Sequence, residues 1–199
     1  MTDIFHWANQ IDSMKRDLQV EIFLFNKNYT PYTIRKASDI EQQLAPVFMF
    51  DLINQITMNA AMGSIVEQLE KFDPKRHLIA TTPLENVGRA ETLIHLIEHE
   101  RHDIVEFSQE EHEFKRMLGM VAVYTHPTNK DVKFYVVKLL QASASISSGV
   151  AWQIVDGQLE GMQPDVALKV PVDNQVLITN GDIFIFNEAK FIKLFNYDI

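Results

Sequence analysis

The amino-acid sequence predicts an α+β fold, with a helix-rich N-terminal part (residues 1–118) before a mainly antiparallel, hairpin-rich sheet (residues 119–199). Apolar residues recur at helical spacing in several segments before Gly119. After Met120, β-branched and aromatic residues become more frequent, and two-residue turn signals separate short apolar runs. These two observations predict the order of the two parts.

The first elements alternate between helix and strand. Residues 2–16 are predicted to form a helix, and the strongly apolar run over residues 18–25 is predicted to form an interior strand of a sheet. A second helix is predicted over residues 47–72, where Asp73 and Pro74 would stop it. Its predicted apolar stripe consists of Leu52, Ile56, Met62, Val66 and Leu69.

A brief strand is predicted over residues 78–80, followed by a third helix that ends near Arg101. Thr82 and Glu85 have the spacing of a capping box, in which each side chain accepts a backbone N–H at the helix start. Pro83 would then occupy the first helical position, where its missing N–H costs nothing.

A second capping box, Ser108 with Glu111, predicts a further helix that ends before Gly119. Beyond it, residues 121–124 and 132–140 are predicted to be strands on either side of a loop.

The last third of the chain alternates strands with tight turns. Residues 150–155 form a β-rich run that ends at Asp156 and Gly157, a pair suited to a hairpin turn. Residues 166–170 continue the pattern, and Pro171 limits that strand to an edge or an end, because proline has no N–H to donate.

The strongest hairpin signal lies between residues 175–179 and 182–186, two apolar runs separated by Asn180 and Gly181. Asn187 is a candidate N-cap for a terminal helix. We expect Phe184 or Phe186 to share a core with the apolar residues of that helix, which are Phe191, Leu194 and Phe195.

A set of packing and turn residues in this region carries a family resemblance. The residues are 132–138 (VKFYVVK), 154–157 (IVDG), Leu168, 176–178 (VLI), 182–187 (DIFIFN) and 191–195 (FIKLF). Over residues 120–197, this pattern resembles the KwaB-like family of the Kiwa anti-phage defence system, a bacterial family long carried as a domain of unknown function. None of these residues is catalytic.

The resemblance implies a non-catalytic cytoplasmic defence component that acts as a homodimer. It implies a small membrane-embedded partner, which would recruit the protein to the inner membrane face, and DNA binding that blocks phage replication or transcription. The acidic N-terminal part would then be a protein-docking surface. Family members run past the length of this chain, so the sheet-rich part is expected to be cut short, with the DNA-contacting residues mainly in the missing portion.

Composition limits the possible functions. The chain has 46% apolar and 23% charged residues, as expected for a folded globular protein, and its N-terminus lacks the features of a secretory signal. No apolar run is long enough to span a bilayer. The absence of cysteine excludes disulfides and thiolate zinc sites.

The net charge of −9 is concentrated in residues 1–117, which carry 12 Lys and Arg against 19 Asp and Glu. Acidic surfaces repel phosphate backbones, so we expect this chain to bind DNA weakly. Lys130, Lys133 and Lys138 form a local basic cluster in the sheet-rich part, but strand alternation sends Lys133 and Lys138 to opposite faces. They are predicted to be solvated strand lysines.

Three histidines, His95, His99 and His102, lie on one helical stripe, and His112 lies on the next predicted helix. The His-Glu-x-x-His zinc motif is missing, because His99 and His102 are one residue too close. We therefore predict polar-face histidines and neither a metal nor another cofactor. The acidic run over residues 106–113 is predicted to be a solvated helix start, and residues 142–149 a plain loop.

No catalytic residue can be nominated from the sequence, so an enzyme is less expected than an interaction protein. The alternatives left open are a nuclease or other hydrolase with dispersed carboxylates, and a plain oligomerisation module. The first alternative requires three carboxylates or histidines to converge in the fold.

Overall fold

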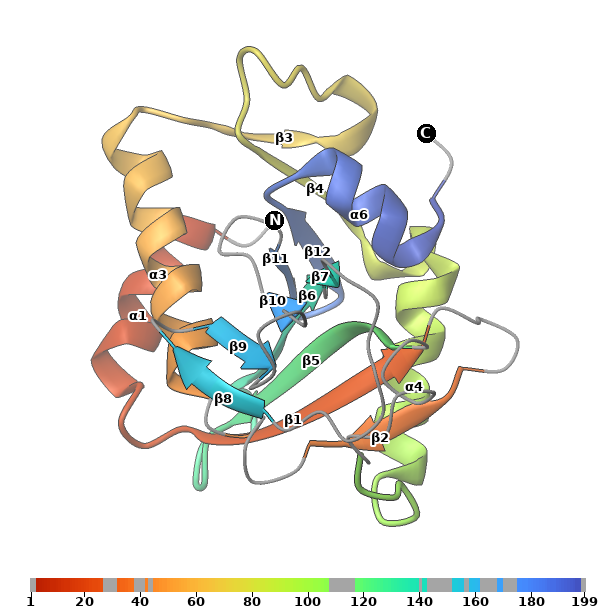
Figure 1. The fold of residues 1–199 in the computed structure, drawn as a ribbon. Helices are drawn as coiled ribbons and strands as arrows, with labels where there is room; N and C mark the ends of the chain where they lie inside the picture. Colours follow the sequence, from red (N-terminus) through yellow and green to blue (C-terminus); the bar gives the residue numbers. More distant parts are fainter. Residues whose placement is uncertain are drawn as a thin grey trace.

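The computed structural model places an extended β-sheet between two pairs of helices (Figure 1). The residues that it describes are 3–26, 32–37, 42, 45–107, 117–139, 141–142, 152–155, 158–161, 168–169 and 175–197.

The main sheet has eight strands, and every neighbouring pair is antiparallel except β3 and β4. Their order across the sheet is β2 (Ile34–Lys36), β1 (Gln19–Asn26), β5 (Met117–Thr125), β6 (Lys133–Leu139), β11 (Gln175–Thr179), β12 (Asp182–Ile185), β4 (Ile79–Pro83) and β3 (Val66–Gln68). Two small antiparallel pairs accompany it, namely β7 (Gln141–Ala142) with β10 (Leu168–Lys169), and β8 (Trp152–Val155) with β9 (Gln158–Gly161).

Helices cover both faces of the sheet (Figure 1). Helices α1 (Ile4–Met14) and α3 (Ala45–Ala61) pack on one face, and α4 (Gly88–Glu100) and α6 (Glu188–Phe195) pack on the other. Short 3-10 turns cover Leu69–Lys71 (η1) and Leu84–Asn86 (η2). The result is a three-layer α/β/α arrangement with a core on each side of the sheet.

Strand alternation fills the two cores separately. On β5, Ala122 and Tyr124 point toward α1 and α3, whereas Val121 and Val123 point toward α4 and α6. Because both faces are covered, interior strands such as β1 and β5 bury nearly continuous apolar runs. This confirms the α+β class and the interior position predicted for β1.

The expected helix-rich N-terminal part is not observed. Strands β1 to β4 come from before Gly119 and share one sheet with the later strands, so helices and strands are interspersed along the chain. Gly119 itself lies within β5. Strands that lie far apart in the chain pair with one another, so the sheet contains strands from both predicted parts.

The helix predicted over residues 47–72 ends at Ala61, so its last part was predicted wrongly. Gly63 has a φ of +69°, a left-handed conformation that stops a helix. The N–H of Gly63 donates to the Ala60 carbonyl, and the N–H of Ser64 donates to the Asn59 carbonyl, which closes the last turn. The apolar spacing that continued beyond this point belongs to β3 and η1.

The capping box at Thr82 was also predicted wrongly. Thr82 is a buried residue of β4 opposite Ile183 of β12, and α4 begins only at Gly88. Leu84 N–H donates to the Gly181 carbonyl at 2.6 Å, which extends the contact with the β11–β12 hairpin. Pairing with this hairpin therefore prevails over the local capping signal. The second box, Ser108 with Glu111, lies outside the described residues.

The hairpin at Asn180 and Gly181 is confirmed. Their φ angles are +50° and +81°, as a type I′ turn requires, and Thr179 pairs with Asp182. Asn187 caps α6 by accepting the Lys190 N–H at 3.1 Å, as predicted. Strands β8 and β9 pair so that only residues 156–157 separate them, although this turn lies outside the described residues.

The prediction that Phe184 or Phe186 shares a core with the terminal helix was wrong, because both residues pack on the other face of the sheet. Phe191 and Phe195 pack on the core that holds Ile183 and Ile185, whereas Phe184 belongs to the opposite core with α3. Phe186 packs against that opposite core too. Both faces of β12 are buried, so apolar content alone does not tell which face meets α6.

Candidate docking surface on helix α3

Helix α3 exposes large apolar side chains to solvent. Phe50 is 69% exposed, Met58 is 55% exposed, and Met62 and Ile65, just beyond the helix, are 67% and 54% exposed. Phe50 and Met58 lie two turns apart, with exposed Asn54 between them. We refer to Phe50, Met58, Met62 and Ile65 as the α3 surface.

The exposed face of α3 carries no charge. The only charged residue of this 17-residue helix is Asp51, which is buried. By contrast, α4 exposes Glu91 and Glu100, and α1 exposes Asp12. A solvent-facing helix normally places charged residues on its outer side, so the α3 surface is unusual for a chain of net charge −9.

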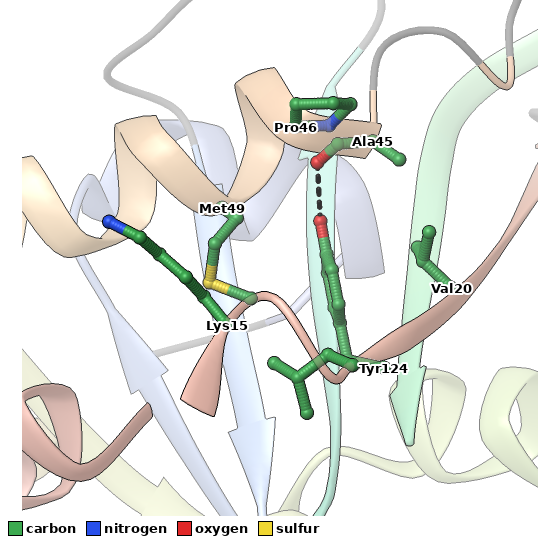
Figure 2. Close-up of a pocket in the computed structure, with 7 residues that line it drawn as sticks. Lys15, Val20, Ala45, Pro46, Met49 and Tyr124 are labelled. Carbon is green, nitrogen blue, oxygen red and sulfur yellow. Dashed lines mark hydrogen bonds between the residues drawn. The ribbon is translucent and has the colours of Figure 1, made fainter. Parts of the chain in front are cut away.

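A small apolar pocket opens beside the first turn of α3 (Figure 2). It has a volume of about 220 Å³. Pro46, which is exposed, lies one helical turn before Phe50, so the pocket adjoins the α3 surface. The residues that line it are Lys15, Leu18, Val20, Ala45, Pro46, Met49 and Tyr124. We call this the Tyr124 pocket.

The hydroxyl of Tyr124 holds the start of α3 in place. It donates to the Ala45 carbonyl at 2.7 Å. Figure 2 shows the ring standing between Met49 on one side and Val20 on the other. Burial raises the pKa of this phenol well above its ordinary value, so the hydroxyl remains protonated and able to donate.

A buried ion pair fixes the middle of the same helix. Lys138 Nζ of β6 lies 2.6 Å from Asp51 Oδ2, and the Lys138 side chain is fully buried. The ammonium also lies 5.2 Å from the centre of the Phe48 ring. The prediction that Lys138 is solvated was therefore wrong, because helices cover both faces of its strand.

Lys133 points to the other face, as strand alternation predicted. Its ammonium is ion-paired with Glu98 of α4, whose carboxylate also accepts the Tyr135 hydroxyl at 2.6 Å. Burial raises the pKa of Glu98, but the hydrogen bonds from Lys133 and Tyr135 and the positive charges of Lys133 and Arg101 outweigh burial and lower it overall. Lys130 is exposed. The three lysines therefore do not form one patch.

The histidines of α4 lie on its solvent side. The rings of His95 and His99 stack with centroids 3.9 Å apart, and His99 Nδ1 lies 3.0 Å from the His95 carbonyl oxygen. His102 is exposed. Within the part of the chain that the structure describes, no three His, Asp or Glu residues form a group that could hold a metal ion.

Several sequence candidates lie outside the described residues. They are His112, residues 108–113 of the acidic run, and residues 143–149 of the small-residue segment.

The α3 surface was missed in the sequence, although a signal for it exists. Residues 45–61 contain one charged residue, Asp51, in a chain of which 23% is charged. The predicted apolar stripe correctly included the buried Leu52 and Ile56, but it also included Met62, which is exposed. The lack of charge on the opposite side of the helix was the signal of the exposed face.

No described helix combines the length and apolar character needed to cross a membrane. Comparison of the chain with family models, curated proteins and solved structures found no match.

Proposed function

We propose that this chain is a non-catalytic interaction component of a Kiwa-type anti-phage defence system, and that it docks its small membrane-embedded partner through the α3 surface. The observation that carries the docking step is the uncharged, apolar outer face of α3. The system and the class of partner come from the KwaB-like resemblance of residues 120–197.

The composition of the α3 surface supports a protein contact. The centres of protein interfaces are depleted in charged residues and enriched in aromatic residues and methionine. Phe50, Met58 and Met62 supply those residue types, and their exposure leaves apolar area that water solvates poorly. A partner with an uncharged apolar face would cover it without burying an unpaired charge.

The rigidity of α3 supports the same role. Tyr124 fixes its first turn and the Asp51–Lys138 pair fixes its middle, so the exposed side chains project from a helix tied to the sheet at two points. Because the helix is already ordered, docking on it loses little backbone conformational entropy.

The Tyr124 pocket supplies an anchoring position next to Phe50. Binding energy in protein interfaces is concentrated in a few side chains that fill pockets. With a volume of about 220 Å³, the pocket can take one large apolar side chain of the partner. Lys15, half-exposed at 51% and paired with Asp12, lines the same pocket and gives it a polar side.

The resemblance also includes a homodimer and DNA binding that blocks phage replication or transcription in the complete protein. For this chain we propose only weak binding to duplex DNA, because its net charge of −9 opposes the phosphates and its sheet lysines lie apart.

Co-purification tests the docking proposal. The tagged chain is co-expressed with the small membrane-embedded partner of the proposed Kiwa-type system and recovered in detergent. Wild-type chain is expected to retain the partner, whereas Phe50→Glu is expected to reduce recovery about tenfold or more, because it places a charge in the interface.

Val105→Glu is the matched control, since Val105 is 58% exposed but lies outside the α3 surface. It is expected to leave recovery unchanged, and both variants are expected to melt like the wild type. Equal recovery with Phe50→Glu and wild type would overturn the docking proposal.

A further inference from the structure

A second pocket lies on another part of the molecule, between the β3–β4 connection and the start of α6. Its volume is about 310 Å³, at the lower end of small-molecule sites. The connection supplies Phe72, Pro74, His77 and Leu78 to its lining, and the start of α6 adds residues 186–189. None of these residues belongs to the α3 surface or to the Tyr124 pocket.

Three aromatic rings line this pocket. Phe72, His77 and Phe186 are each half-buried, so they keep part of their surface open. The rings of Phe72 and His77 are neighbours, with centroids 6.5 Å apart and a tilt of 41°. Half-open rings in a pocket favour a flat aromatic ligand, because such a ligand stacks on them without displacing the core.

Polar groups also line this pocket. Asn187 uses Oδ1 to accept the Lys190 N–H, which leaves its Nδ2 hydrogens as the donors it can offer a ligand. Glu188 adds a carboxylate acceptor beside it. A neighbouring donor and acceptor match the edge of a nucleobase, which presents both kinds of group.

Cationic side chains stand outside the pocket. Asp73 organises the turn by accepting the Lys75 N–H at 3.0 Å on its carboxylate and the His77 N–H at 2.8 Å on its carbonyl. Lys75 and Arg76 are exposed on this turn, and the Arg76 side chain is 82% exposed. Its contact with Asp73 is long, 3.7 Å, so the guanidinium remains available to an anion.

We infer that this pocket binds a nucleotide, with the base stacked among Phe72, His77 and Phe186 and the phosphate outside, on Lys75 and Arg76. Asn187 and Glu188 contact the edge of the base. The ligand is a free mononucleotide or one exposed nucleotide of a single strand, since both present the same base and phosphate. A duplex does not fit, because its bases are stacked inside the helix.

Saturation-transfer NMR and calorimetry with AMP, GMP, CMP and UMP test this inference. At least one nucleotide is expected to bind with saturation transferred to its base protons. Arg76→Glu is expected to weaken binding about tenfold, whereas the matched control Arg16→Glu, an exposed arginine elsewhere, leaves it unchanged. Phe72→Leu keeps an apolar side chain but removes a ring, and is expected to weaken binding by a similar factor.

Further probes separate the two sources of the ligand and the competing explanations. A short single strand that binds much more tightly than the mononucleotide of the same base assigns the site to a strand, and equal affinities assign it to a free nucleotide. Inorganic phosphate or N-acetyl-tyrosinamide binding as tightly as the best nucleotide would overturn the inference. So would the absence of binding by every nucleotide at about 10 mM.

Discussion

Lys138 of β6 and Asp51 of α3 form an ion pair, with Nζ 2.6 Å from Oδ2, inside the core between the sheet and the helix. Lys138 is fully buried and the side chain of Asp51 is 8% exposed. Such a pair adds little net stability over apolar residues, because both charges lose their hydration, but it penalises any packing that separates them. It therefore specifies how α3, which carries the proposed docking surface, sits on the sheet.

Asp51→Ala should lower the free energy of unfolding by about 3 to 5 kcal/mol, because it leaves the Lys138 ammonium buried without its partner. The double variant Asp51→Leu with Lys138→Met should recover most of this loss, since no charge remains in the core. Urea unfolding of the wild type, the single variant and the double variant measures both effects. A double variant as unstable as Asp51→Ala would show that packing volume, and not the unpaired charge, causes the loss.

The free energy of unfolding should depend on pH through the Glu98 carboxylate. Its pKa in the folded protein lies below the ordinary value of 4.5, so its contribution is fully present above that pH and is lost as the pH falls through the folded value. Glu98→Gln should therefore destabilise the protein most above about pH 4.5, by about 1 to 3 kcal/mol. The difference from wild type should shrink at lower pH in denaturant titrations.

Glu91→Gln is the control for this comparison, because Glu91 is an exposed residue of the same helix. It should change the free energy of unfolding by no more than about 0.5 kcal/mol. A difference between Glu98→Gln and wild type that grows as the pH falls would contradict the assigned direction of the Glu98 pKa.

Gly181→Ala should cost about 1 to 2 kcal/mol of stability, because a side chain at φ +81° strains the backbone. Gly88→Ala is a matched control, since a Cβ at either glycine meets no atom within 4 Å and only Gly181 has a positive φ. Thermal melts should show a lower midpoint for Gly181→Ala alone. Equal midpoints for the two variants would mean that the turn does not need its left-handed geometry.

Tyr124→Phe should cost about 1 to 2 kcal/mol, because it removes a buried hydroxyl that bonds the first turn of α3. The effect should be local, so amide hydrogen exchange should quicken at Met49 more than in the middle of α3. Unchanged exchange at Met49 would argue against a role for the hydroxyl in holding the helix start.

Local signals in the sequence predicted the local parts of the fold. The Asn180-Gly181 hairpin and the Asn187 cap depend on neighbouring residues, so their residue types sufficed. The end of α3 was predicted wrongly because the apolar spacing was followed past Gly63, whose left-handed conformation stops the helix. The role of Thr82 was predicted wrongly because its strand, β4, pairs with the distant strand β12. Competition of this kind is invisible to a local pattern.

The candidate sites were harder to predict than the strands. Alternation separated Lys133 from Lys138, but only the three-layer packing shows that Lys138 is buried against Asp51. The pocket beside α6 joins segments about a hundred residues apart in the chain, so no spacing rule brings Phe72 and Phe186 together. The basic turn with Lys75 and Arg76 was not predicted as a site, because only the fold adds Phe186 to the rings of Phe72 and His77 next to it.

Site-specific crosslinking tests the docking of α3 most directly. The chain contains no cysteine, so Met58→Cys and Val105→Cys each introduce a single thiol at positions that are 55% and 58% exposed in the wild type. Each variant is loaded with a thiol-specific photocrosslinker and illuminated in complex with the membrane-embedded partner. We predict a crosslink to the partner from position 58 and none from position 105. A complex that forms normally but crosslinks only from position 105 would contradict the assignment of the docking surface to α3.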